Sequence, residues 1–204
     1  MGEFQPSGIQ LHLITGRKHM FYQGDASLLN NICSDLDGRV FSRTNLILES
    51  LQDVTSFPGH ALIGITILTD TIPESFYERE RLSKTVITQI SQETFQFRRL
   101  QDLAKEEGQR SALLSELEFV SGERLFLEFS EIAVSGMRER NALNHLFAHP
   151  SLSCRRLEGG FSIWNTKHIV SWSHYPKLEV PAHAWPAESL SQPDMGDATV
   201  LKML

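Results

Sequence analysis

Two segments far apart in the chain share one pattern, in which apolar and polar residues alternate and a turn glycine follows. The first covers residues 9–13 and leads to Gly16, and the second covers residues 116–119 and leads to Gly122. An alternation with a period of two residues is typical of a half-buried strand, and glycine suits the tight turn that reverses the chain. Because a second strand can follow in each case, the pattern predicts two β-hairpins.

The elements expected after each hairpin also occur in the same order, a short helix and then two more strands. Asp25 is a suitable N-cap for the first helix, and Ser135 for the second, which is expected at residues 137–147. The motif Phe-Ser-x-x-Asn occurs twice, beginning at Phe41 and at Phe161. On these grounds an internal duplication and a chance similarity of two β-rich units are both open.

The middle of the chain supplies a central strand and a helix. Residues 61–67 are apolar and largely β-branched, which predicts a strand covered on both faces. A strand at 85–90 and a helix at 92–107 are expected next. On a helical wheel one side gathers apolar residues, namely Ile90, Phe97, Leu100, Leu103 and Ala104. This stripe predicts a helix that covers the sheet.

These elements place the chain in the α+β class. We expect two similar β-hairpin/helix/β-hairpin units, packed around the central buried strand and the amphipathic helix. The expected parts are an N-terminal β-rich unit at 1–70, a helical connecting segment at 71–115, a C-terminal β-rich unit at 116–176, and an extended Pro-rich arm at 177–204.

Composition narrows the classes of protein that the chain can represent. Its 204 residues include 19 basic and 25 acidic ones, and the net charge of −6 disfavours nucleic acid as a partner. Only 2 cysteines are present, too few for a disulfide scaffold. No apolar run is long enough to span a membrane, and the first residues do not form an export signal. We therefore expect a cytoplasmic protein without membrane contact.

The local motifs of common enzymes are missing from the sequence. There is no Gly-x-Gly-x-x-Gly, no Gly-Lys-Ser/Thr phosphate loop, no His-Glu-x-x-His, no Cys-x-x-Cys and no Gly-x-Ser-x-Gly. Sites assembled from distant residues leave no such trace. No cofactor is predicted, and the sequence leans toward a non-enzymatic role.

Histidines in the last third of the chain are the candidates for a metal site, and they are His145, His149, His168 and His174. The first two are four residues apart, a spacing at which helical side chains can share a transition metal. Histidine near a helix C-terminus is also favoured by the helix dipole alone. The alternative function on this pattern is a metal-dependent, hydrolase-like enzyme.

Aromatic residues cluster in the same region and suggest a contact surface. All three tryptophans fall between Trp164 and Trp185, and the candidate surface consists of Trp164, Trp172, Tyr175 and Trp185. Exposed aromatic residues are typical of interfaces and of pockets for flat ligands, whereas buried ones would form the core of the C-terminal unit. The leading hypothesis is a non-enzymatic binding or regulatory module. It would use this surface for a protein or small ligand, and would be a homo-oligomer or bind a protein partner.

Overall fold

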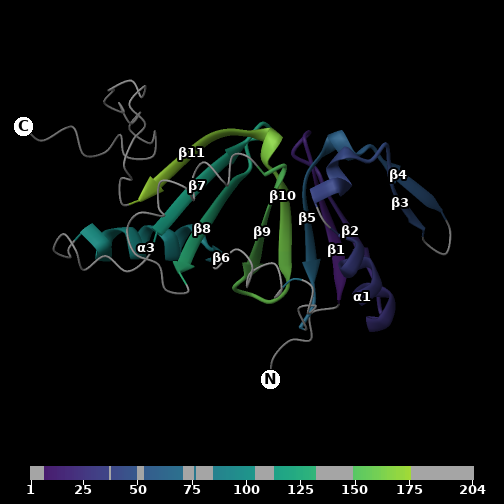
Figure 1. Cartoon of the computed structure of the whole chain (residues 1–204), viewed down its shortest axis with the longest axis horizontal. Coiled ribbons are helices and arrows are strands. Elements are labelled where there is room, and N and C mark those ends of the chain that lie inside the picture. Colours follow the sequence, from purple (N-terminus) through teal and green to yellow (C-terminus); the bar gives the residue numbers. More distant parts are fainter. Residues whose placement is uncertain are drawn as a thin grey trace, which may run out of the picture.

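The fold is α+β, as the sequence predicts, and strands make up most of it (Figure 1). The structure is a computed structural model that describes residues 7–36, 38–49, 53–70, 76, 85–103, 113–131 and 149–175. The helix expected at 137–147 and the arm expected at 177–204 lie outside these residues. No helix in the described ranges is long and apolar enough to cross a membrane.

Nine strands form one mixed sheet, in the order β11-β7-β8-β6-β9-β10-β5-β1-β2. Their bounds are β1 Gly8–Leu13, β2 Lys18–Tyr22, β5 Leu62–Leu68, β6 Thr85–Ile90, β7 Leu113–Phe119, β8 Arg124–Glu131, β9 Ser151–Arg156, β10 Phe161–Asn165 and β11 Ile169–Tyr175. Neighbours are antiparallel except for β6 and β9, which are parallel. Two further strands, β3 Leu46–Glu49 and β4 Val54–Phe57, pair separately. The N-terminal and C-terminal parts of the chain thus share one sheet.

β5 is the buried strand that the apolar run predicts. Ile63, Ile65 and Ile67 are each at most 1% exposed. Ile65 and Ile67 belong to a core on one face of the sheet, and Ile63 belongs to a second core on the other face. β-Branched side chains suit such a strand because they pack well against neighbours on a pleated surface.

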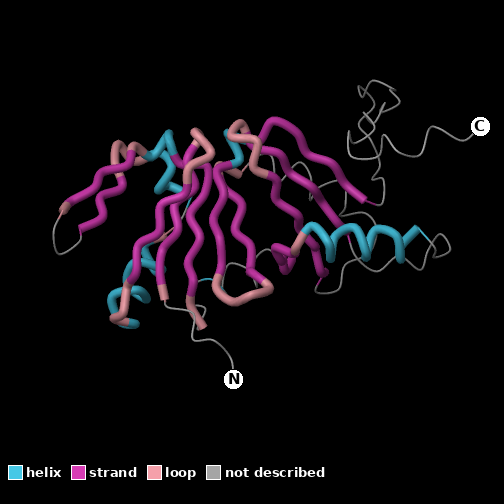
Figure 2. Tube along the Cα trace, turned by 180° about the vertical axis from the view of Figure 1, so that it is seen from behind, coloured by secondary structure: helices cyan, strands magenta, loops and turns pink. Residues whose placement is uncertain are grey.

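The outer face of the N-terminal half is covered by α1 (Ala26–Asp35), the 3-10 helix η1 (Gly38–Ser42) and the β3–β4 pair. Asp25 caps α1 as predicted, because its carboxylate accepts from the backbone N–H groups of Ser27 and Leu28. In the C-terminal half α3 (Gln92–Leu103) lies beside the strands (Figure 2).

Two residues of the apolar stripe predicted to cover the sheet do not face it. Phe97 and Leu100 are 61% and 66% exposed, whereas Phe95 is fully buried. The Phe95 ring lies 5.0 Å from that of Phe126 and 5.8 Å from that of Tyr175. The helix starts directly after β6, with Ser91 as its N-cap, so its first turn is fixed against the sheet and Phe95 is the side chain that enters the core.

The repeated Phe-Ser-x-x-Asn motif does not mark equivalent positions. Phe41 lies in η1, a 3-10 helix, while Phe161 begins the strand β10. The Asn165 side chain accepts from the Lys167 N–H and caps the 3-10 helix η3 (Thr166–His168), and its Nδ2 also donates to the distant Leu62 carbonyl. The internal duplication therefore stays a prediction.

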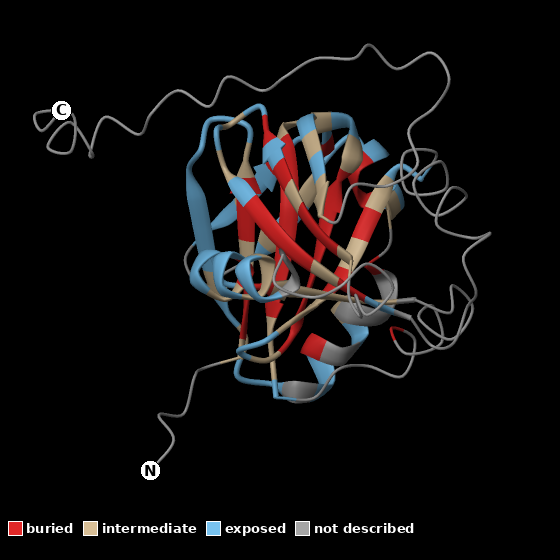
Figure 3. Cartoon of the chain, turned by 90° about the vertical axis from the view of Figure 1, so that its left-hand side faces the viewer, coloured by how far each residue is buried: buried red, intermediate tan, exposed pale blue. Residues whose placement is uncertain are grey.

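The sheet curls so that the inner faces of its two halves meet (Figure 3). The Trp164 ring of β10 lies 5.1 Å from that of Phe119 at the end of β7, and 4.7 Å from that of His12 on β1. The turn between β1 and β2 also approaches the turn between β7 and β8, because a Cβ on Gly16 would lie 3.6 Å from the Ser121 carbonyl oxygen. This curl positions the polar groups described next.

Candidate functional site

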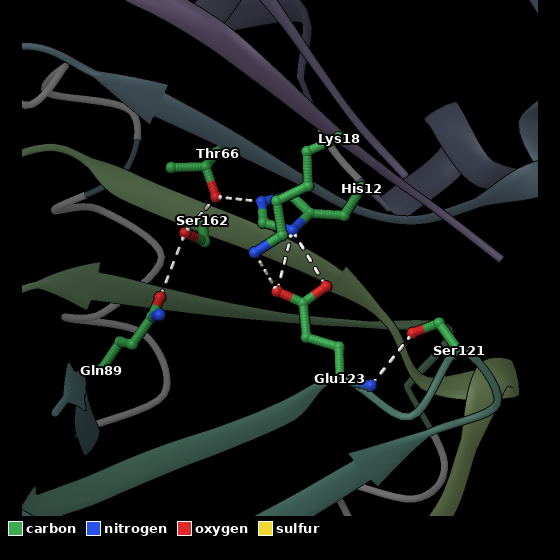
Figure 4. A network of polar contacts seen from close by, with 7 residues as sticks. All are labelled: His12, Lys18, Thr66, Gln89, Ser121, Glu123 and Ser162. Carbon is green, nitrogen blue, oxygen red and sulfur yellow. Dashed lines mark hydrogen bonds and ion pairs between the residues drawn. The ribbon is translucent and has the colours of Figure 1, made fainter. Parts of the chain in front are cut away.

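A chain of buried polar side chains crosses the inner face of the sheet (Figure 4). His12 on β1, Thr66 on β5 and Ser162 on β10 are 4%, 2% and 0% exposed. The strand register places Thr66 directly opposite Ser162. Buried polar groups need partners to offset the loss of water, and these residues supply them to one another.

The contacts run in an unbroken line from the β7–β8 turn to β6. His12 Nδ1 lies 3.1 Å from both carboxylate oxygens of Glu123, a residue 111 positions away in the chain. His12 Nε2 lies 3.0 Å from Thr66 Oγ1, which is 2.9 Å from Ser162 Oγ. Ser162 in turn donates to Gln89 Oε1 over 3.4 Å.

These bonds give His12 a polar partner at each ring nitrogen. A carboxylate can only accept, so Nδ1 of His12 donates to Glu123. Nε2 lies against the Thr66 hydroxyl, and the Thr66 and Ser162 hydroxyls extend the network to Gln89.

Glu123 is held as a carboxylate by its surroundings. Burial alone would raise its pKa, but hydrogen bonds and charges from His12 and Lys18 outweigh burial and lower the pKa. Lys18 Nζ lies 2.7 Å from Oε1. The backbone N–H of Glu123 donates to Ser121 Oγ over 3.2 Å, which fixes the turn that carries the carboxylate.

Carboxylate, imidazole and hydroxyl follow one another here in the order of an acyl-transfer triad. Thr66 would be the nucleophile, yet its side chain lies in the interior and its hydroxyl is shared with Ser162. The side chains packed over Thr66 would block a substrate carbonyl from reaching that oxygen. The contacts instead join β1 to the β7–β8 turn, and we call the His12, Lys18 and Glu123 group the clasp.

Sequence reasoning missed the clasp. The alternation of residues 9–13 puts His12 on the polar face of its strand, and only the structure shows that this face turns inward. One signal was available, since Thr66 interrupts an otherwise apolar run and a polar residue in a buried strand needs a partner. Nothing local in the sequence points to Glu123 as the distant end of that network.

The structure separates the aromatic residues of the predicted surface. Trp164 is 1% exposed and packs over Gly64, where a Cβ would lie 2.4 Å from the ring, so Trp164 belongs to the core. Trp172 and Tyr175 are half-buried on β11. Trp172 packs on the inner core, while Tyr175 lies beside Phe95 on the α3 side. Trp185 lies outside the described residues.

β11 carries these two aromatic residues at one edge of the sheet. Within the described residues it pairs only with β7. Val170, Ser171 and Ser173 are exposed along it. Arg99 of α3 stacks over the Tyr175 ring, 4.1 Å from its centroid.

The candidate metal-binding histidines are engaged separately. His168 Nε2 bonds the His60 carbonyl over 2.9 Å, and His174 Nδ1 lies 2.7 Å from Ser115 Oγ in a hydrogen bond. Six residues of extended chain separate His168 and His174, roughly 20 Å. His149 is exposed, and His145 lies outside the described residues. Within the described ranges no group of three His, Cys, Asp or Glu residues could hold a metal ion.

Burial lowers the pKa of His174 to about 4, which leaves the ring neutral at neutral pH. In the part of the chain that the structure describes, the polar groups of the clasp bond one another, whereas β11 pairs with a strand on one side only. Comparison of the chain with protein-family models, with curated proteins and with solved structures finds no match. Its function is therefore argued from its own residues.

Proposed function

We propose that the protein is a non-enzymatic binding module, and that β11 accepts an extended segment of a protein partner as an additional antiparallel strand. The observation that carries this proposal is the character of β11. It is a seven-residue edge strand with one pairing neighbour in the described part of the chain. An edge strand presents N–H and C=O groups that another strand can pair with.

β11 lacks the charged and proline residues that often protect a sheet edge, although its pairing with β7 is irregular between Ile169 and Ser171. Its sequence, Ile-Val-Ser-Trp-Ser-His-Tyr, contains no Asp, Glu, Lys, Arg or Pro. His174 adds no charge at neutral pH because burial lowers its pKa to about 4. The opposite edge differs, since β2 has five residues and begins with Lys18 of the clasp. Edges without charge or proline are the ones that pair with other chains.

The aromatic residues of β11 support specificity for the added strand. Strand addition draws affinity from main-chain hydrogen bonds and specificity from side chains on alternate positions. Trp172 and Tyr175 lie near the edge on opposite faces, and Val170 is 58% exposed. A bound segment would therefore contact an aromatic ring on each face of the sheet.

Selection from a displayed library of random extended peptides tests this proposal. Selected peptides should bind the full chain, slow amide exchange in β11, and lose binding in Ser173→Pro, which disrupts the edge. Met20→Pro on β2 is the matched control, because it places proline in the opposite edge strand. Circular dichroism would verify that both variants fold. Peptides that bind Ser173→Pro as well as the wild type, or that protect β2 instead, would contradict the proposal.

A further inference from the structure

We propose that the strand that pairs with β11 in the free protein is β11 of a second copy of this chain. The result is a symmetric dimer in which the two nine-stranded sheets join edge to edge. This inference rests on the proposed function, because it requires that β11 accept a strand. It goes further by naming the partner and its orientation.

The centre of β11, Ser171-Trp172-Ser173, has the same sequence in both directions and can therefore pair with itself in antiparallel orientation. A two-fold axis at Trp172 brings Ser171 opposite Ser173 of the second copy, and Trp172 opposite its own equivalent. Aromatic pairs across neighbouring strands are among the more stabilising ones. Serine side chains are small, so opposite serines let the two strands approach closely. The strand contains no Asp, Glu, Lys or Arg, so no like charges face each other across the axis.

The charges on the next strand inward do not oppose this pairing. Glu116 and Glu118 of β7 neighbour Ser173 and Ser171 on the outer face. Glu116 forms an ion pair with Arg124, and Glu118 accepts from the Ser171 hydroxyl. In the dimer, three strand spacings would separate these glutamates from those of the second copy, roughly 14 Å. That exceeds the Debye length of about 8 Å at physiological ionic strength.

The same geometry limits the assembly to two copies. Pairing through one edge is isologous, so both copies use β11 and neither offers it again. The remaining edge, β2, has a different sequence, and its Lys18 is engaged with Glu123. We therefore expect a closed dimer and no filament.

Charge complementation in the full chain tests the inference. Sedimentation equilibrium should show the wild type as a dimer. The variants Ser171→Lys/Ser173→Lys and Ser171→Asp/Ser173→Asp should each sediment as monomers, because like charges then face each other across the axis. An equimolar mixture of the two should sediment as a heterodimer at low salt. Ser56→Lys, an exposed change on β4, is the control and should remain dimeric.

Other outcomes separate this inference from the proposed function. A wild type that is monomeric at every concentration overturns the self-pairing, as does a dimer that both double variants retain, or two folded variants that do not combine. Should a variant fail to fold, wild-type amide exchange in β11 decides, since only self-pairing slows it as protein concentration rises. If β11 does not self-pair but still binds selected peptides, the proposed function stands. If it binds neither, both fail.

Discussion

Although Glu123 is partly exposed, its replacement should lower the stability of the protein clearly. Glu123→Gln removes the carboxylate that pairs with Lys18 and faces the buried His12 ring. Breaking a buried pair costs about 3–5 kcal/mol, and the clasp should fall at or below that range because Glu123 and Lys18 remain 19% and 47% exposed. Urea denaturation would measure the loss in the free energy of unfolding.

Glu158→Gln is the control for that variant. Glu158 also bonds a cation, Arg156, over 3.1 Å, but its side chain is 58% exposed. An exposed pair contributes about 0–1 kcal/mol, so this variant should be close to wild type. Equal losses in both variants would show that the clasp is no stronger than a surface ion pair.

The buried His174 gives the protein a defined pH dependence. Its pKa is lowered by burial from the ordinary value of 6.5 to about 4 in the folded state. Between these values the unfolded chain binds a proton that the folded chain does not, so stability falls as the pH falls from 6.5 to 4. Glu123 acts in the same direction at lower pH, because its stabilising effect is lost as the pH falls through its lowered pKa.

His174→Gln isolates the histidine contribution. We expect the variant to lose less stability than the wild type between pH 6.5 and 4, while both respond alike above pH 7, where neither state of His174 binds a proton. Urea unfolding midpoints measured across this range provide the comparison. An identical slope in the two proteins would show that His174 is not the group that titrates. NMR titration of the ring would give its folded pKa directly.

Among the elements, α3 shows how a correct helix can be assigned the wrong face. The helix and its Ser91 cap follow from local sequence, and so do β5 and the alternating strands, because period and capping are local properties. The face that a helix buries depends on where its first turn is anchored. Phe126 and Tyr175 contact Phe95 only in the folded protein, so helical spacing in the sequence cannot predict this contact.

Truncation of two phenylalanines on α3 tests that assignment. Phe95→Ala should cost about 3–5 kcal/mol, because it removes a fully buried ring from the core beneath the helix. Phe97→Ala should cost less than about 0.5 kcal/mol, as is usual for exposed positions. Chemical denaturation of both variants supplies the two values. A larger loss at Phe97 would mean that the predicted stripe is the buried face in solution.

The candidate site is harder to predict from the sequence than the helices and strands are. The sequence indicates Trp172 and Tyr175 as contact residues because clustered aromatic residues are easily recognised. Trp164 shares that pattern, yet Gly64 leaves space for its ring inside the sheet, and only strand pairing reveals that space. The edge position of β11 depends on the strand order of the whole sheet, which no single segment encodes.

At the scale of the whole molecule, the strand order leads us to expect that the described fold unfolds as one unit. β9 and β10 come from the C-terminal part of the chain, and β10 pairs directly with β5 from the N-terminal part. The clasp and the contact between the His12 and Trp164 rings join the same two parts on the inner face. Removing either half would expose both the pairing edge of a buried strand and half of the inner core.

A single cooperative transition is therefore expected on heating or in urea. All three tryptophans lie after residue 163, so tryptophan fluorescence reports mainly on the C-terminal half, although Trp164 also contacts His12 and Gly64. Phe57 and His19, whose rings lie 5.3 Å apart, offer an NMR probe in the N-terminal half. Coincident midpoints from the two probes, and a fragment of residues 1–70 that does not fold alone, would establish one folding unit. Separate midpoints would show that the two halves unfold independently. The shared sheet and the Glu123–His12 contact would then not couple them into one folding unit.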